Sequence, residues 1–207
     1  MEFVRELCRI GGSTIVGQKV DIARLRAAFG DDESAHAVSS LLAIKNGFYA
    51  FNQALHVFSD AGTPREPGLI EWNSPKCWKQ FYGAAARGIH FAEDCFGNQF
   101  QCIDGRISLL TVDRATSRVI AETIDDWAHL ILDDPCRWAK QHVSDEWQRK
   151  YGRLAPGDRL VTEISPLAGG DFSHLNARAE EEIEAMRYRG RRLRELQKHP
   201  CERINWH

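Results

Sequence analysis

The chain has 207 residues, of which 43% are hydrophobic and 27% charged, an ordinary globular composition long enough for one sizeable core. Its formal net charge of −2 does not indicate a nucleic-acid binder, although residues 1–134 carry 18 acidic against 13 basic side chains and so favour basic partners. No apolar run approaches the ~18 residues of a membrane span, and no segment resembles a signal peptide, so we expect a cytoplasmic protein.

The N-terminal part combines helix signals with glycine-rich and proline-rich segments. In chain order it predicts a linker over residues 1–17, helices over 20–29 and 31–46, and an ambiguous apolar segment over 47–58. A loop over residues 59–75 and a short helix over 75–82 follow. Gly30 and the Asn46-Gly47 pair end the two helices because these residues tolerate positive φ. The linker glycines fit neither spacing of a phosphate-binding loop. Periodicity does not decide between strand and helix for the ambiguous segment.

An antiparallel β-meander is predicted for the middle of the chain. Its four strands are expected at residues 88–93, 98–103, 106–112 and 118–121. Turn residues join them, and an Asp-Gly pair between two apolar runs is a strong hairpin signal. We therefore expect the apolar side chains of these strands in the core. The acidic side chains beside the turns are expected in solvent: Glu93, Asp94 and Asp104.

The rest of the chain predicts mostly helix. Thr123 and Asp126 resemble a capping box, which opens a helix whose Trp127 is expected in the core. An irregular region holds one strand over residues 159–164, and apolar residues at helical spacing predict a final helix over 176–198. The prediction is an α+β fold in which helices flank a central antiparallel meander. We divide the chain into a linker (residues 1–17), a main domain (residues 18–134) and a C-terminal helical extension packed on that domain (residues 135–207).

This order of elements resembles that of the SUKH superfamily. The segments that carry the resemblance cover about residues 18–134: LLAIKNGFYAF, LHVF, GIHFAEDCFGNQFQCIDGRI and TIDDWAHLIL. The tail segment PLAGGDFSHLNARAEEEIEAMRYRG looks like an extension of bacterial members, in which a Gly-Gly-Asp/Glu-aromatic turn precedes an amphipathic helix. Cysteines around the central hairpin depart from the commonest pattern of the family.

The resemblance implies a protein-binding function. Bacterial members of the superfamily are largely immunity proteins that bind and neutralise a cognate toxin, often a nuclease, and other members are protein-interaction modules. The family has a mixed α+β fold and no shared catalytic residue set. We therefore expect an immunity protein that occludes a protein toxin and performs no chemistry.

Cysteine and histidine residues near the central hairpin raise two chemical alternatives. Cys95 with His90 as its base could act as a cysteine-dependent hydrolase, and Cys95 and Cys102 with His90 or His56 could bind a metal. A nucleophile needs its base within hydrogen-bond reach, and two thiolates do not complete a tetrahedral metal site. We expect no catalytic residue, no metal and no cofactor. In the reducing cytosol we expect six free thiols. None of the six cysteines lies in a C-x-x-C pair, which argues against a structural zinc site.

An acidic, aromatic-bearing surface is the predicted partner-binding site. Nuclease toxins have basic active-site clefts because their substrate is a polyanion, and a carboxylate surface gains association rate by electrostatic steering. The predicted residues come from the loop and the turns: Asp60, Glu66, Glu71, Trp72, Glu93, Asp94 and Asp104. Trp78 is a second aromatic interface candidate. The competing hypotheses are the Cys95 hydrolase and a regulatory protein-interaction scaffold without a toxin.

The last predicted helix carries a basic stripe: Arg187, Arg191, Arg194 and Lys198. Glutamates lie beside this stripe, and Glu184 is placed to form an ion pair with Arg187. We interpret the stripe as a solvated helix face, and we expect direct contact with neither nucleic acid nor membrane.

Overall fold

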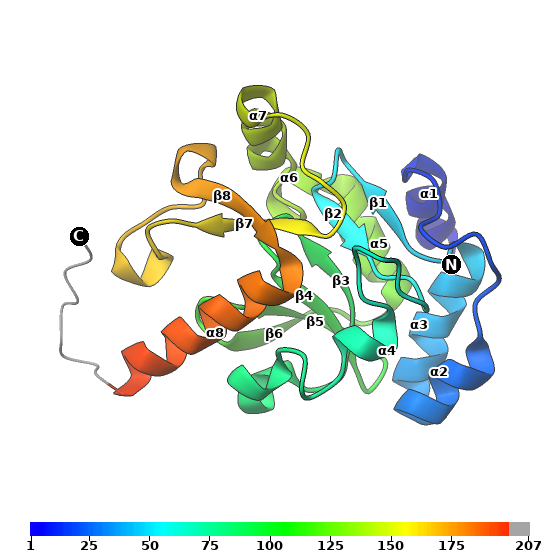
Figure 1. The fold of residues 1–207 in the computed structure, drawn as a ribbon. Coiled ribbons are helices and arrows are strands. Elements are labelled where there is room, and N and C mark those ends of the chain that lie inside the picture. Colours follow the sequence, from blue (N-terminus) through cyan, green and yellow to red (C-terminus); the bar gives the residue numbers. More distant parts are fainter. Residues whose placement is uncertain (199–207) are drawn as a thin grey trace.

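A six-stranded antiparallel sheet organises the protein, as Figure 1 shows. This computed structural model describes residues 1–198, with side chains described as far as Glu195. The strands are β1 (Phe48–Ala50), β2 (Leu55–Val57), β3 (Ile89–Asp94), β4 (Gln99–Ile103), β5 (Arg106–Thr111) and β6 (Thr116–Ala121). They follow one another across the sheet in chain order, so each pairs with its sequence neighbour. The predicted α+β meander is confirmed, and the ambiguous segment adds two strands to it.

Eight α-helices are described, with short 3₁₀ turns between some elements. The helices are α1 (Glu2–Ile10), α2 (Ile22–Phe29), α3 (Glu33–Ile44), α4 (Leu69–Trp72), α5 (Ile124–Asp133), α6 (Pro135–Trp138), α7 (Gln141–Tyr151) and α8 (Glu182–Lys198). The 3₁₀ turns are η1 (Lys79–Phe81), η2 (Gly83–Ala86), η3 (Pro166–Ala168) and η4 (His174–Asn176). The predicted Thr123 cap is confirmed, because its Oγ1 accepts a hydrogen bond from the Asp126 N–H at 3.1 Å. No helix within residues 1–198 is long and apolar enough to cross a membrane.

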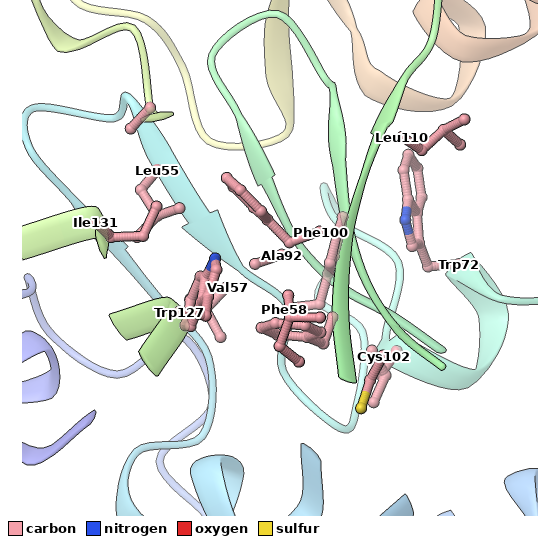
Figure 2. Close-up of a cluster of buried hydrophobic side chains, with 14 of the residues drawn as sticks. Leu55, Val57, Phe58, Trp72, Ala92, Phe100, Cys102, Leu110, Trp127 and Ile131 are labelled. Atoms are coloured by element: carbon pink, nitrogen blue, oxygen red, sulfur yellow. The ribbon is translucent and has the colours of Figure 1, made fainter. Parts of the chain in front are cut away.

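The aromatic core lies between one face of the sheet and α5. Phe91 of β3 and Phe100 of β4 make edge contacts with the Trp127 ring at 4.9 and 5.5 Å between centroids. Trp127 is fully buried, as predicted. Figure 2 shows Trp72 and Leu110 on the opposite side of these strands from Phe100 and Trp127, so both faces of the sheet are covered.

Two segments near the ends of the chain differ from the prediction. Residues 2–10 form α1 where we expected a linker; Val4 and Leu7 are fully buried, and the Val4 N–H donates to Asp125 Oδ1 at 2.9 Å. The final helix begins at Glu182, because the residues before it form β8 (Ala177–Glu181), which pairs antiparallel with β7 (Asp158–Thr162). The extension is thus a hairpin followed by a helix.

Candidate functional site

A row of polar side chains crosses the sheet on the face opposite Trp127. The strand register places Tyr49 of β1 opposite His56 of β2, His56 opposite Glu93 of β3, and Glu93 opposite Gln99 of β4. Directly opposed residues point to the same face of a sheet, so the four side chains form one continuous line. His56, Glu93 and Gln99 are at most 1% exposed.

The C-terminal extension covers this row with two further charged residues. Arg159 of β7 donates from Nε to Glu93 Oε1, and its guanidinium carbon lies 5.2 Å from the centre of the Tyr49 ring. Glu182, the first residue of α8, places Oε2 3.6 Å from His56 Nδ1. The Leu160 N–H also donates to the Cys95 carbonyl at 2.7 Å. Charged groups therefore join the extension to the centre of the sheet.

Hydrogen bonds extend the row into a network at both ends. The Tyr49 hydroxyl donates to Glu66 Oε1. At the other end, Gln99 Nε2 donates to Glu93 Oε2 at 2.7 Å, and Trp72 Nε1 donates to Gln99 Oε1 at 2.8 Å. Buried polar groups are stable only when they are paired in this way.

The charges within the row shift one another's protonation. Burial by itself would raise the pKa of Glu93, but Arg159 and His56 outweigh it and lower that pKa to about 2. Burial, together with the Glu93 charge, raises the pKa of Glu182 to about 7. Burial would lower the pKa of His56, yet the carboxylates of Glu182 and Glu93 raise it overall. The carboxylates therefore favour the protonated form of His56, and burial favours the protonated form of Glu182.

Three potential metal ligands meet in this row. Nitrogen of His56 and carboxylate oxygens of Glu93 and Glu182 all lie within 4.8 Å of one another. None of the three side chains is more than 1% exposed, so a substrate does not reach them in this conformation. The arrangement suits a bound proton or cation with a structural role better than it suits catalysis.

The comparisons with known proteins give a fold and no family. No family model matches the chain, and no curated protein matches it. Among solved structures, the chain is similar to the crystal structure of Atu4351 from Agrobacterium tumefaciens, with a TM-score of 0.54. The match covers 90% of this chain and 87% of that chain at 12% sequence identity. At this identity the likeness shows a shared fold alone.

Most of the predicted partner-binding side chains are not at the surface. Our expectation of an exposed site is wrong for five of them, which are 0–8% exposed: Asp60, Glu66, Trp72, Glu93 and Asp94. Trp78, the second aromatic candidate, is also fully buried. Glu71 in α4 and Asp104 in the β4–β5 turn are exposed, and a partner contact for these two stays a prediction.

Hydrogen bonds to nearby and distant backbone groups explain why two of these acids are buried. Asp94 Oδ1 accepts from the N–H groups of Phe96 and Asn98, both at 2.9 Å, so its side chain builds the β3–β4 turn. Asp60 Oδ2 accepts from the Asp21 N–H at 2.7 Å and so holds the residue that caps α2. Both acids therefore have structural roles.

The cysteine alternative loses its chemical basis in this structure. Cys95 is fully buried, and burial raises the pKa of its thiol well above the usual range, whereas a nucleophile needs a lowered one. Its Sγ contacts the Lys140 carbonyl at 3.8 Å, while His90 Nδ1 lies 3.3 Å from Asn73 Oδ1. The two side chains thus have different partners. The five cysteines within the described residues are free thiols, and Cys201 lies outside them.

A closed loop over residues 163–176, between β7 and β8, exposes apolar side chains that sequence reasoning missed. Ile164, Leu167 and Leu175 are 57%, 45% and 65% exposed. Asn176 closes the loop: its Oδ1 accepts from the Ile164 N–H at 2.8 Å, and its Nδ2 donates to the carbonyls of Ile164 and Asp171 at 2.9 and 2.8 Å. The PLAGGDF motif within this loop is the signal in the sequence, but as a motif it indicates only the family resemblance and not an exposed apolar surface.

The basic stripe of α8 is partly occupied by contacts within the chain. The predicted ion pair is confirmed, with Arg187 Nη1 2.8 Å from Glu184 Oε1. Arg187 Nε also donates to the Cys77 carbonyl, and Arg194 donates to the Gln80 carbonyl. The Lys198 side chain lies outside the described residues. These contacts make part of the stripe a packing surface of the helix.

Proposed function

We propose that this protein is a cytoplasmic, non-catalytic immunity protein that binds a cognate bacterial protein toxin, as the SUKH resemblance implies. Fold alone does not specify function, so the proposal depends on the surface. The observation that supports it most is the closed loop over residues 163–176, which displays three large apolar side chains. Exposed apolar residues on an ordered loop are typical of protein–protein contact.

The loop is held in place before any partner arrives. Phe172 makes an edge contact with Phe96 at 5.0 Å, which joins the loop to the β3–β4 turn. The Gly170 N–H donates to the Ser165 carbonyl at 3.0 Å, and a Cβ at Gly170 would lie 1.9 Å from the Ile164 carbonyl oxygen. Fixing a binding loop in advance lowers the entropy lost on association. The loop therefore has the properties of a preorganised contact surface.

Co-expression with the toxin encoded by a neighbouring gene tests the proposal. We expect the protein to protect cells from that toxin and to elute with it as one complex on size exclusion. The Cys95→Ala variant should protect as well as the wild type, because the proposed role needs no thiol chemistry.

Two results would count against this function. Loss of protection by a folded Cys95→Ala protein that still binds the toxin would favour the hydrolase. Absence of any toxin gene nearby, together with a complex formed with a non-toxin protein, would favour a regulatory scaffold.

A further inference from the structure

The buried row carries more negative than fixed positive charge. Glu66, Glu93 and Glu182 supply three carboxylates, all at most 8% exposed. Arg159, which is permanently charged, contacts Glu93 and offsets one of the three. Unbalanced charge inside a protein is costly. A proton on His56 offsets a second carboxylate, whereas a divalent cation bound to the neutral ring offsets both that remain.

The spacing of the polar atoms also favours an atom between them. His56 Nδ1 lies 3.3 Å from Glu93 Oε1 and 3.6 Å from Glu182 Oε2. A direct charge-assisted N–H···O⁻ bond is usually about 2.7–2.9 Å long. Ligand atoms bound at about 2.0–2.1 Å in a tetrahedral zinc site lie about 3.3–3.4 Å from one another. These two separations match shared coordination better than direct pairing, and all three ligand atoms lie within 4.8 Å of one another.

Glu182 supplies an independent sign of a missing ligand. Its side chain is fully buried. Its Oε2 pairs with His56 Nδ1 only at 3.6 Å, beyond hydrogen-bond distance, and its Oε1 has no hydrogen-bond partner among the described residues. A buried carboxylate paired this loosely is destabilising unless something else binds it. Since its Oε2 faces His56 Nδ1, the open coordination of Glu182 lies on the side of the other two ligands.

The surroundings resemble an outer shell that orients metal ligands. Gln99 and Arg159 donate to the two oxygens of Glu93, and a coordinating carboxylate commonly has such partners. The second nitrogen of His56 faces Glu66 Oε1 at 3.8 Å, and Tyr49 holds that carboxylate. A histidine that binds a metal through one nitrogen usually directs the other toward a carboxylate or carbonyl.

We propose that His56, Glu93 and Glu182 together bind one divalent first-row transition-metal ion, Zn²⁺ in the first place. The ligands come from β2, β3 and the start of α8, so the ion joins the C-terminal helix to the sheet. The second oxygen of Glu182 or a water completes the coordination. The site is structural, because its ligands are enclosed.

The site is tested by measuring the metal content of the full chain. The protein is expressed without a tag in zinc-supplemented medium. We expect close to one zinc per chain, and a melting temperature about 5 °C or more below that of the zinc-loaded protein after the metal is removed with a chelator. Glu182→Gln should lose at least tenfold of the bound zinc. The control Glu184→Gln changes an exposed carboxylate two residues along the same helix and should keep it.

Substitution of the metal by cobalt distinguishes binding at this site from binding by cysteines. It uses the wild-type protein, so the result does not depend on how well Glu182→Gln folds. We expect the wild-type protein to bind one Co²⁺ with a visible ligand-field spectrum and without the intense thiolate charge-transfer band. A folded wild-type chain that takes up neither metal would overturn the proposal. A thiolate charge-transfer band in the cobalt spectrum would also overturn the proposal. Full retention of zinc by Glu182→Gln would do the same. None of these measurements requires the toxin, so they are independent of the proposed function.

Discussion

Buried charged residues hold α8 against the turns of the sheet. Arg189, in the middle of α8, donates from Nε and Nη2 to the two oxygens of Asp113 at 2.9 and 2.5 Å, and from Nη1 to the Phe96 carbonyl. Both side chains of the ion pair are at most 7% exposed. One guanidinium thus contacts the β5–β6 turn and the β3–β4 turn at once.

Removing the carboxylate of this pair is expected to be costly. Asp113→Asn leaves the Arg189 charge buried without its counter-ion, and such losses are typically about 3–5 kcal/mol of unfolding free energy. Urea denaturation measures it. The exposed Asp104→Asn control should change stability by less than about 0.5 kcal/mol. A loss as small as the control's would mean that water reaches Arg189.

His90 predicts a specific pH dependence. Burial, with Lys79 nearby, lowers the pKa of His90 well below its usual value, so the folded protein keeps the ring neutral. The unfolded chain binds a proton there below about pH 6.5, and stability therefore falls as the pH decreases from that value.

Urea denaturation between pH 7 and pH 5 tests the His90 prediction. The His90→Gln protein should lose less stability with falling pH than the wild type does, by up to about 1.4 kcal/mol per pH unit below 6.5. The exposed His142→Gln control should show the slope of the wild type. Parallel curves for His90→Gln and the wild type would show that His90 accepts a proton in the folded state.

At the scale of elements, the meander could be predicted because its signals are local. Asp104 and Gly105 both adopt positive φ in the β4–β5 turn, which the Asp-Gly pair indicates without any knowledge of the rest of the fold. β8 could not be predicted in this way. Its ARAEE sequence suits a helix, and its strand conformation depends on pairing with β7, a non-local contact that overrides propensity.

Gly190 of α8 packs closely against η1, so we expect its replacement by alanine to lower stability, although helix propensity alone would raise it. A Cβ at Gly190 would lie 2.4 Å from Phe81 Cβ and 3.2 Å from the Tyr82 ring. Gly→Ala in a free helix stabilises by about 1 kcal/mol, but here the added methyl group must separate the two elements.

We therefore expect Gly190→Ala to destabilise the protein by about 1–3 kcal/mol in urea denaturation. Arg191→Ala, an exposed neighbour on the same helix, should stay within about 0.5 kcal/mol of the wild type. A Gly190→Ala protein more stable than the wild type would show that α8 is not packed closely against η1.

At the scale of the whole molecule, the C-terminal extension completes the centre of the protein. Glu93 contacts Arg159, which lies 66 residues further along the chain, and the burial of Glu93 depends on that contact. The sequence around Glu93 shows only an acid beside a turn, so it suggested a solvated position. Long-range partners decide burial, which is why the acidic surface could not be located from local patterns.

In the proposed function, the contact surface is therefore the closed loop over residues 163–176 and not the buried acids. Binding energy at interfaces concentrates in a few well-packed side chains. Leu175 is the most exposed large apolar residue of those that the structure describes, and it should be one of these side chains. Its replacement should leave folding intact because so much of the side chain lies in solvent. Ile22, 38% exposed at the first position of α2, offers a matched control, since an acidic residue suits a helix start.

Isothermal titration calorimetry with the toxin of a neighbouring gene tests most directly whether the closed loop binds the partner. The measurement compares the affinities of Leu175→Asp, Ile22→Asp and the wild type. We predict at least a 30-fold loss for Leu175→Asp, equivalent to about 2 kcal/mol, and wild-type affinity for Ile22→Asp. Full affinity of a folded Leu175→Asp protein would contradict the account.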